Sequence, residues 1–374
     1  MAATDWVRPE IAELSAYHVA PARDMRKLDA MENPYELPAA LRDELAQELA
    51  QAALNRYPDP SGGGLKEELA AAFGVPAGMP LLLGNGSDEI ITLITQTLAR
   101  PGATVLSVEP AFVMYRMNAV FSGMRYVSVP LTDEFALDLP AMLAAIEAHQ
   151  PAVVFVAYPN NPTGPRFARD EVIRIIEAAP GLVVVDEAYA AFADDSFLPD
   201  VGRWPNLVVM RTLSKLGLAG IRLGFAAGTP EWISQLDKVR PPYNVNLLTQ
   251  VTARFALRHL EVFAAQAATL CQERGRLLAA LLELPNVRVW PSEANFLTLR
   301  LPDARAAFAA LQSAGILVKN LHGVHPLLDN CLRFTVGSPQ ENDAVLAALA
   351  ELVQRPECGR TGVYFLVGPD PENN

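Results

Sequence analysis

Short apolar runs alternate with helical patterns through the first two thirds of the chain. Most of the runs are rich in valine, and they occupy residues 81–83, 103–108, 125–129, 152–158, 182–185 and 207–210. Strands that are apolar throughout are typical of a mostly parallel sheet with helices on both faces, because a sheet with one wet face would alternate apolar and polar residues. The pattern therefore predicts an α/β fold with a mostly parallel central sheet.

Polar residues mark where several of the intervening helices begin. Ser87 opens the segment SDEIITLITQTLA, which has two acidic residues in its first turn, so Ser87 is expected as an N-cap. Asp138 stands in the same position before LPAMLAAIEAH, and a further helix is expected near residues 168–178. These helices would provide the crossovers that parallel strands need.

The pattern changes at about residue 246. A stretch rich in alanine and leucine predicts one long helix to about residue 283, and the mixture of short strands and helices after it predicts a smaller α+β domain. The strands are expected near 287–290, 295–300, 316–318 and 331–336, and the helices at 303–314 and about 340–353. The expected organisation is an N-terminal segment (1–40) packed on the small domain, a large domain (41–245), the connecting helix with the small domain (246–354), and a tail (355–374) of unknown role.

Length and charge limit the classes of function. The 374 residues suit two domains of about 100–200 residues each, and 51% of them are apolar, which excludes wholesale disorder. Thirty basic against 42 acidic residues give a net charge of −12, which argues against nucleic acid or an anionic membrane as the main partner. An anionic substrate would have to be bound by a few local arginine or lysine residues.

Cysteine usage and the N-terminal sequence favour a cytoplasmic protein. The three cysteines include no C-x-x-C pair and the five histidines are scattered, so neither a metal site nor a disulfide framework is expected. The opening MAATDWVRPEIAEL lacks the apolar core of a secretory signal. No apolar run reaches the ~18 residues that a membrane helix needs.

The common phosphate-binding and acyl-transfer motifs are missing. The chain has neither G-x-x-x-x-G-K-[ST] nor G-x-S-x-G. The glycine run 62–64 follows RYPDPS rather than a strand, so it is expected to form a turn before a helix and not a dinucleotide-binding loop.

Among the five lysines, Lys215 has the most unusual surroundings. Lys66 and Lys238 lie among charges on expected helix faces, and Lys27 lies in the charged stretch RDMRKLD. Lys215 instead follows an apolar strand and precedes the glycine-rich segment LGLAGIRLG. A lysine at the end of a buried strand loses hydration, which lowers its pKa and makes the amine nucleophilic. On this observation alone, a catalytic amine and a structural surface lysine both stay open.

Polar residues at the ends of two of the expected strands strengthen the catalytic interpretation. Asp186 ends the apolar run LVVV, where a carboxylate is costly unless it meets a cation such as a protonated pyridine nitrogen. Tyr189 follows three residues later, and the turn YPNNPTG (158–164) comes after another strand, where open α/β sheets bind ligands. Each of these residues could separately be structural. Their occurrence together in one order along the chain is specific: Asn161, Asp186, Tyr189, Lys215 and Arg222.

This combination resembles the fold-type I aminotransferases of the aspartate aminotransferase superfamily, which depend on pyridoxal 5′-phosphate (PLP). The resemblance extends from about Val7 to Val353 and excludes the tail. Within the superfamily the chain is most similar to the histidinol-phosphate aminotransferases, mainly through RYPDP, DEAYAAF and the LVKN…CLRFTVG stretch. The other motifs that carry the resemblance are MENPYELP, LLGNGSDEII, EPAFVMY, YPNNPTG, RTLSKLGLAGIRLGF and SEANFL.

The resemblance implies PLP as the cofactor and assigns roles around its ring. Lys215 would hold the cofactor as a Schiff base and then act as the base that moves the proton. Asp186 would keep the pyridine nitrogen protonated, so that the ring acts as an electron sink. Tyr189 and Asn161 would hydrogen-bond the ring's O3′.

The resemblance also implies how the ring face and the phosphate are held. Phe112 in EPAFVMY would stack on the ring, with Tyr115 as the alternative. Tyr57 in RYPDP matches a tyrosine that reaches the phosphate from the other subunit, which implies a homodimer with shared active sites. The phosphate itself would lie at a helix N-terminus, where backbone N–H groups favour an anion. The residues expected there are Gly86, Ser87, Asp88, Ser214 and Arg222.

Four residues are candidates for binding the substrate. Arg333 lies in the strand CLRFTV, where a cation without an anion is costly, and an arginine at an exposed strand edge is the alternative. Lys319 would add a second charge that only a phosphate can reach, and it stands where many family members have arginine, so a bidentate contact becomes a point-charge contact. Tyr17 and Asn33 are further candidates for the same phosphate by resemblance.

The reaction implied by the resemblance is transamination of L-histidinol phosphate with 2-oxoglutarate to imidazole acetol phosphate and glutamate, a step of histidine biosynthesis. Two alternatives on the same fold stay open. They are an aromatic or other amino-acid aminotransferase, and a PLP-dependent decarboxylase of a phosphorylated amino acid. A PLP-binding regulatory module is disfavoured, because the sequence has no basic helix-turn-helix extension.

Overall fold

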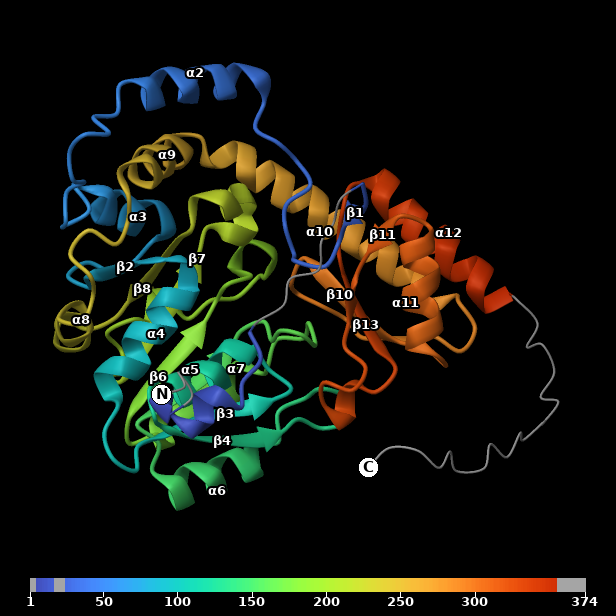
Figure 1. The fold of residues 1–374 in the computed structure, drawn as a ribbon, viewed down its shortest axis with the longest axis horizontal. Coiled ribbons are helices and arrows are strands. Elements are labelled where there is room, and N and C mark those ends of the chain that lie inside the picture. The colour runs from blue at the N-terminus through green and yellow to red at the C-terminus, as the bar shows by residue number, and fades with distance from the viewer. Residues whose placement is uncertain (1–4, 17–23, 355–374) are drawn as a thin grey trace.

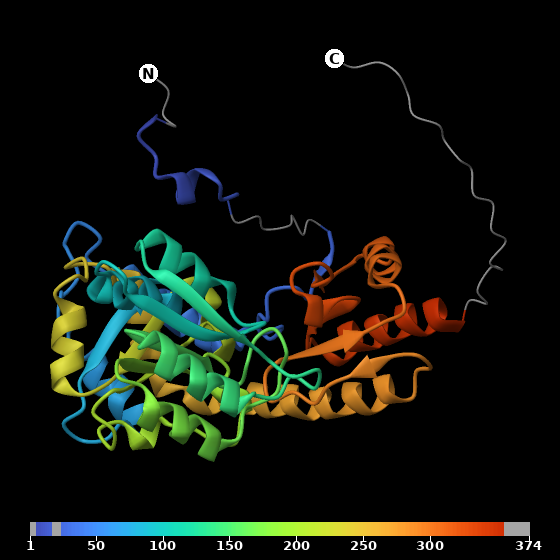
Figure 2. The same cartoon turned by 90° about the horizontal axis from the view of Figure 1, so that it is seen from below.

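A computed structural model describes residues 5–16 and 24–354 of the chain. It has a large α/β unit and a smaller α+β unit, and helix α10 (Leu260–Leu282) runs along both of them (Figures 1 and 2). In the described part of the chain, no helix is both long and apolar enough to cross a membrane. Tyr17 and the 355–374 tail lie outside the described residues.

The large unit is built on a seven-stranded sheet in the order β2-β8-β7-β6-β5-β3-β4. Neighbouring strands are parallel except where β8 pairs, because β8 is antiparallel to both β2 and β7. The prediction of a mostly parallel sheet is therefore confirmed. The strands are β2 (Leu81–Asn85), β3 (Thr104–Glu109), β4 (Arg125–Pro130), β5 (Val153–Ala157), β6 (Leu182–Asp186), β7 (Leu207–Thr212) and β8 (Leu223–Ala227).

Strand β8 was not predicted, because its sequence LGFAA continues a glycine-rich segment and is short. All of its residues are buried, and the strand closes the sheet between β2 and β7. A Cβ atom on Gly224 would lie 2.7 Å from the carbonyl carbon of Gly86 and 2.8 Å from the nitrogen of Ser87. Glycine is needed at position 224 because the strand passes directly beneath the first turn of the helix that begins at Gly86.

Helices cover both faces of this sheet and form two hydrophobic clusters with it. Helices α4, α5 and α8 contribute to one cluster, and helices α3, α6, α7 and α9 contribute to the other. This arrangement explains why the strands are apolar throughout. The helices are α3 (Leu65–Phe73), α4 (Gly86–Leu98), α5 (Val113–Phe121), α6 (Leu139–His149), α7 (Arg169–Ala178), α8 (Pro230–Asp237) and α9 (Leu247–Arg258).

One predicted helix cap is confirmed and one is wrong. The Asp138 side chain accepts the N–H of Ala141 at 3.0 Å and caps α6 as predicted. Helix α4 begins one residue earlier than predicted, at Gly86, with Asn85 rather than Ser87 as its N-cap. The Glu89 carboxylate accepts the Asn85 N–H at 2.7 Å and thereby fixes the start of the helix. The first turn of α4 is thus shaped by a glycine and a glutamate, which leaves the Ser87 side chain at the surface of the pocket described below.

The single long helix predicted over residues 246–283 is two helices, α9 and α10, that meet at His259. Helix α9 contacts α3 and α2 (Ala39–Ala50) in the large unit, whereas α10 continues into the small unit. The chain turns between the two helices at His259, where the backbone leaves the helical region at φ −125° and ψ 32°. The turn lets α9 pack in the large unit while α10 continues into the small unit.

The small unit contains a four-stranded antiparallel sheet, covered by helices, and a two-stranded parallel pair. The order of the larger sheet is β12-β13-β10-β9, so β13 is an inner strand. The strands are β1 (Arg26–Lys27), β9 (Arg288–Val289), β10 (Phe296–Arg300), β11 (Ile316–Leu317), β12 (Lys319–Asn320) and β13 (Cys331–Thr335), and the helices are α11 (Ala304–Ser313) and α12 (Pro339–Gln354).

The N-terminal segment divides between the two units. Strand β1 pairs with β11 in the small unit, in line with the expectation for residues 1–40. Helix α1 (Pro9–Ala12) instead contacts α5 of the large unit, where the Arg8 guanidinium donates to the carbonyl oxygen of Phe121 at the end of that helix. The expectation that the whole segment packs on the small unit is therefore wrong for this stretch, which is held by the exposed carbonyl groups of a helix C-terminus.

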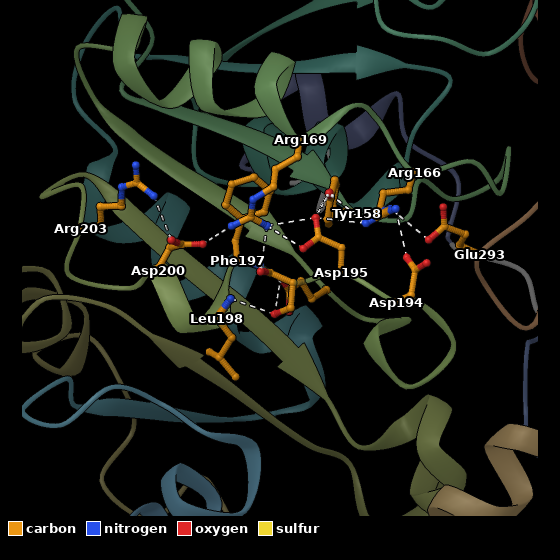
Figure 3. Close-up of polar contacts among 12 residues, drawn as sticks. Tyr158, Arg166, Arg169, Asp194, Asp195, Phe197, Leu198, Asp200, Arg203 and Glu293 are labelled. Carbon is orange, nitrogen blue, oxygen red and sulfur yellow. Dashed lines mark hydrogen bonds and ion pairs between the residues drawn. The ribbon is translucent and has the colours of Figure 1, made fainter.

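A network of ion pairs lies beside the carboxyl ends of the strands (Figure 3). Arg166 contacts Asp194 at 3.1 Å and Glu293 of the small unit at 3.0 Å, so it connects the two units. Arg169 pairs with Asp195 at 2.8 Å and with Asp200. These contacts fix the loops that follow β5 and β6.

Glu187 carries the most deeply buried charge of this region, with an exposed fraction of 1%. Arg211 pairs with it at 2.8 Å, the Ser196 hydroxyl donates to it at 2.9 Å, and the Phe197 N–H donates at 2.5 Å. Because Glu187 directly follows Asp186, the Arg211 pair holds the end of β6 in place.

Replacing Arg211 with methionine is expected to lower the free energy of unfolding by about 3–5 kcal/mol, because the buried Glu187 carboxylate would lose its cation. The matched control is Arg203→Met, since the Arg203 side chain is 65% exposed and only 3.4 Å from Asp200. That variant is expected to lose less than about 1 kcal/mol. Urea denaturation of the three proteins measures the difference, and equal losses would contradict the assignment.

Candidate active site

A pocket lies at the carboxyl ends of β5, β6 and β7, between the first turn of α4 and the segment that leads out of β1. It brings together most of the residues that the sequence predicted for the site. The predicted residues that line it are Ser87, Asp88, Phe112, Asn161, Asp186, Tyr189, Ser214, Lys215 and Arg222. The other lining residues are Met31, Tyr115, Ala157, Pro159, Ala188 and Thr212.

Lys215 lies in the short helical turn Ser214–Leu218 that follows β7. Its Nζ atom donates to the carbonyl oxygen of Ala30 at 3.0 Å. Burial and, secondarily, the positive charge of Arg333 lower the pKa of Lys215 to about 8. Near neutral pH a fraction of the protein therefore carries this amine in its neutral, nucleophilic form.

Asp186 is the last residue of β6 and is 4% exposed. The Tyr115 hydroxyl donates to its Oδ2 at 2.6 Å, and the Ala188 N–H donates to its Oδ1 at 3.1 Å. Burial raises the pKa of Asp186 to about 6, although both hydrogen bonds act in the opposite direction. Because both donors are neutral, a cation placed in the pocket would stabilise the charged carboxylate.

Arg333 is not among the residues that line the pocket, but it joins the two units through Asn161, which does line it. From β13, its guanidinium donates to Oδ1 of Asn161 and, at 2.9 Å, to the carbonyl oxygen of Asp29. It also lies over the ring of Phe296, at 5.3 Å, and the buried ring of Tyr189 packs edge-on against the same phenylalanine. Arg333 is 7% exposed and on an inner strand, so the alternative of an exposed strand edge is wrong.

The opposite corner of the pocket is a potential anion site. Arg222 donates to Oγ of Ser214 at 3.3 Å and pairs with Asp88 at 3.2 Å. A Cβ atom on Gly86 would lie 2.6 Å from Nη2 of Arg222, so only glycine allows this approach, and Gly86 also adopts a φ of +72°. The first N–H groups of α4 have no acceptor within the helix, so Ser87 and Asp88 add backbone donors to the guanidinium.

The structure separates the roles of the two aromatic candidates for stacking. Phe112 is half-buried just before α5 and lines the pocket. Tyr115 is fully buried beneath it, with its ring stacked on Phe155 at 4.7 Å and its hydroxyl bound to Asp186. Phe112 is therefore the ring available at the pocket wall, and Tyr115 supports Asp186.

Tyr57 and Asn33 lie outside this pocket. Tyr57 is 80% exposed and stacks on Tyr243, with the ring centroids 4.5 Å apart. Asn33 donates to the carbonyl oxygen of Leu216 at 3.1 Å and to Oε1 of Gln266 at 3.0 Å, so it holds the turn that carries Lys215 against α10.

Of the two remaining substrate candidates, the structure describes Lys319 but not Tyr17. Lys319 lies on β12 directly opposite Arg333 of β13 in the strand register, so the two residues are cross-strand neighbours. Tyr17 lies outside the described residues.

The segment 29–31 contributes to the site in ways that the sequence did not predict. The carbonyl oxygens of Asp29 and Ala30 bind the two cations Arg333 and Lys215, and Met31 lines the pocket. A backbone carbonyl has no side-chain signature, so only the MENPYELP motif could have drawn attention to this segment. The hydrogen bond between Tyr115 and Asp186 was also missed, because the two residues are 71 positions apart.

Comparison with known proteins gives a consistent assignment. The profile of the family "aminotransferase class I and II" matches residues 23–349. A histidinol-phosphate aminotransferase of Chromobacterium violaceum is 67% identical over 92% of this chain and 96% of its own length. Histidinol-phosphate aminotransferase 1 of Ralstonia nicotianae is 56% identical over 93% of this chain and 94% of its own. The crystal structure of histidinol-phosphate aminotransferase from Sinorhizobium meliloti in complex with pyridoxal-5′-phosphate superimposes with a TM-score of 0.82 at 27% identity, covering 93% of this chain and 97% of that one.

Class I and II aminotransferases depend on PLP, and the residues of the pocket fit this cofactor. The buried Asp186 carboxylate with two neutral donors matches a protonated pyridine nitrogen, and the Lys215 amine matches the aldehyde. The corner formed by Arg222, Ser214 and the start of α4 matches the phosphate. When bound, PLP supplies the carbon that receives amino groups and a ring that acts as an electron sink.

The family profile covers most of the chain, the pocket has the donors and acceptors that PLP requires, and the similarity to the Chromobacterium protein extends over nearly all of both sequences. The chain therefore belongs to the class I and II aminotransferases and, within them, to the histidinol-phosphate aminotransferases.

Proposed function

We propose that this chain transfers the amino group of L-histidinol phosphate to 2-oxoglutarate, giving imidazole acetol phosphate and glutamate in histidine biosynthesis. The observation that carries the proposal is the 67% identity to a relative named for this substrate. The cross-strand neighbours Arg333 and Lys319 support it, because they bring two basic residues together in a chain of net charge −12. A substrate with a doubly charged phosphate gains more from such a pair than one with a single carboxylate.

The proposed roles follow from the positions of the side chains. Lys215 Nζ would take the proton from the substrate's Cα and deliver it on the cofactor side of the transferred nitrogen. Asp186 holds a proton on the pyridine nitrogen, and Tyr115 orients the Asp186 carboxylate. Tyr189 and the amide of Asn161 bind O3′ of the ring, and Phe112 covers the ring face.

The proposed phosphate site includes a residue from a second copy of the chain. Gly86, Ser87, Asp88, Ser214 and Arg222 form the site within one chain. Tyr57 is not among the residues that line its own pocket and is 80% exposed, and Leu54 nearby is 72% exposed. These exposed side chains support a homodimer in which Tyr57 reaches the phosphate in the partner's pocket.

The proposed substrate is tested by single-turnover reaction of the PLP-loaded protein with histidinol phosphate and with each common amino acid. Histidinol phosphate is expected to change the absorbance of the bound cofactor fastest, and Lys215→Ala is expected to turn over at a negligible rate. Faster reaction of an aromatic amino acid would identify an aromatic aminotransferase instead. Release of carbon dioxide from a phosphorylated amino acid would identify a decarboxylase.

Asp186→Asn is expected to retain the fold but to lose several orders of magnitude in turnover, because an amide cannot stabilise a protonated pyridine. The same variant has a pH signature in the protein without cofactor. The pKa of Asp186 is raised from 3.8 to about 6, so the folded state binds the proton more tightly than the unfolded state between these values. Asp186 should therefore contribute a fall of about 3 kcal/mol to the parent's free energy of unfolding as the pH rises from about 4 to about 6.

Asp186→Asn should lack this pH-dependent loss, and its unfolding free energy relative to the parent should grow over the same interval. Urea denaturation at a series of pH values measures both proteins. Identical pH dependence in the two would show that Asp186 is not the source of the shift, and near-normal turnover would show that another group serves the ring nitrogen.

Arg333→Ala is expected to slow the reactions of both histidinol phosphate and glutamate, by about 2–5 kcal/mol in transition-state terms, because a desolvated charge pair is lost. Lys319→Ala is expected to weaken mainly the reaction of histidinol phosphate, whose phosphate carries the extra charge. Single-turnover kcat/KM for both donors separates the two roles. Equal losses for the two donors in Lys319→Ala would reject a selective role for Lys319.

A further inference from the structure

The segment Asp29–Met31, here called the strap, connects the small unit to both buried cations of the active site. The carbonyl oxygen of Asp29 accepts from Arg333 at 2.9 Å, and the carbonyl oxygen of Ala30 accepts from Lys215 at 3.0 Å. Two successive carbonyl groups therefore hold two like charges that repel each other, since Arg333 lowers the pKa of Lys215. The direction of each carbonyl depends on the backbone conformation of the strap.

That conformation is unusual for an L-residue. Met31 has a φ of +55°, in the left-handed region that side chains with a Cβ rarely adopt. The strap keeps it because both polar groups of Met31 are bonded to the small unit. Its N–H donates to Oγ1 of Thr335 at 2.9 Å, and its carbonyl oxygen accepts from Nδ2 of Asn295 at 3.0 Å. Such a conformation persists only where its surroundings fix it from several sides.

Thr335 and Asn295 are themselves rigidly placed. Both are buried, at the end of β13 and just before β10, where these strands pair. The Thr335 N–H donates to the carbonyl oxygen of Leu28 at 2.8 Å, so Thr335 binds the chain on both sides of Asp29. Neither residue lines the pocket, and their hydrogen bonds to Met31 connect them through the strap to the Lys215 amine.

The Lys215 amine needs a fixed acceptor because the charges around it act in different directions. Arg333 and Arg222 repel its charged form, while Asp88 and Glu32 attract it. The Ala30 carbonyl is the hydrogen-bond acceptor that determines where the free amine lies among these groups. A shift of the strap would leave the amine without this acceptor and free to rotate.

We propose that Thr335 and Asn295 are positioning residues of the aminotransferase: they fix the strap so that the Ala30 carbonyl holds the Lys215 amine whenever that amine is free. The inference rests on the proposed role of Lys215 as the reactive amine. It extends that role to two buried side chains that do not line the pocket.

The test measures the pKa of the Lys215 amine in the full chain without cofactor, by competitive acetylation with acetic anhydride across a pH series and mass spectrometry of the Lys215 peptide. Thr335→Val keeps the shape of the side chain and removes the acceptor for Met31. Asn295→Leu removes the donor from the other side. Thr335→Ser keeps the hydroxyl, and Thr104→Val is the control for a buried threonine of strand β3.

In Thr335→Val and Asn295→Leu, the pKa of Lys215 is expected to fall by about half a unit or more, because the ammonium loses a carbonyl acceptor. In the PLP-loaded enzyme, kcat is expected to fall about tenfold or more, as for a misplaced general base. Thr335→Ser and Thr104→Val should match the parent in both measurements. If one of the two variants fails to fold, the other tests the same contact from the opposite side.

Three outcomes overturn the proposal. An unchanged pKa of Lys215 would show that the strap does not hold the amine, and a raised pKa would show that the site has opened to water. A rise in KM with unchanged kcat would mean that the strap serves Arg333 alone. Failure of the proposed function is distinguishable, because it would show already in the parent as a Lys215 amine that titrates like an exposed lysine.

Discussion

The burial of the Asp186 carboxylate at the end of β6 is the constraint on which the rest of the site depends. Every residue of β6 is buried, so the carboxylate has little access to bulk water, and its two hydrogen-bond donors are neutral. A buried charge is stable only with a compensating charge nearby, and a protonated pyridine nitrogen provides one. A cationic ring in the pocket would supply that compensating charge.

The cationic side chains around the pocket have a different kind of hydrogen-bond partner from the Asp186 carboxylate. Lys215 and Arg333 donate to backbone carbonyl oxygens, and Arg333 donates also to the neutral amide of Asn161. These neutral acceptors satisfy N–H groups without cancelling the positive charge. This matters in a chain with a net charge of −12, whose overall field repels an anionic substrate.

The connection between the two units follows from the same contacts. Arg333 of the small unit binds Asn161 of the large one. Arg166 of the large unit pairs with Glu293 of the small one (Figure 3). The turn 158–164 contains the first contact and ends two residues before the second, so the residues that face the cofactor and those that face the substrate are positioned together. A change in the packing of the units would therefore alter binding and chemistry at once.

The sequence by itself determined the parallel sheet and the order of Asn161, Asp186, Lys215 and Arg222, because apolar strands and the polar residues after them are local signals. Strand β8, the break at His259 and the N-cap Asn85 escaped prediction, since each is decided by what packs against it. The bonds of Tyr115 to Asp186 and of Ala30 to Lys215 join residues 71 and 185 positions apart. Only the tertiary structure could decide them, because a hydrogen bond requires atoms within about 3 Å, and the distance between remote segments is set by the packing of the whole chain.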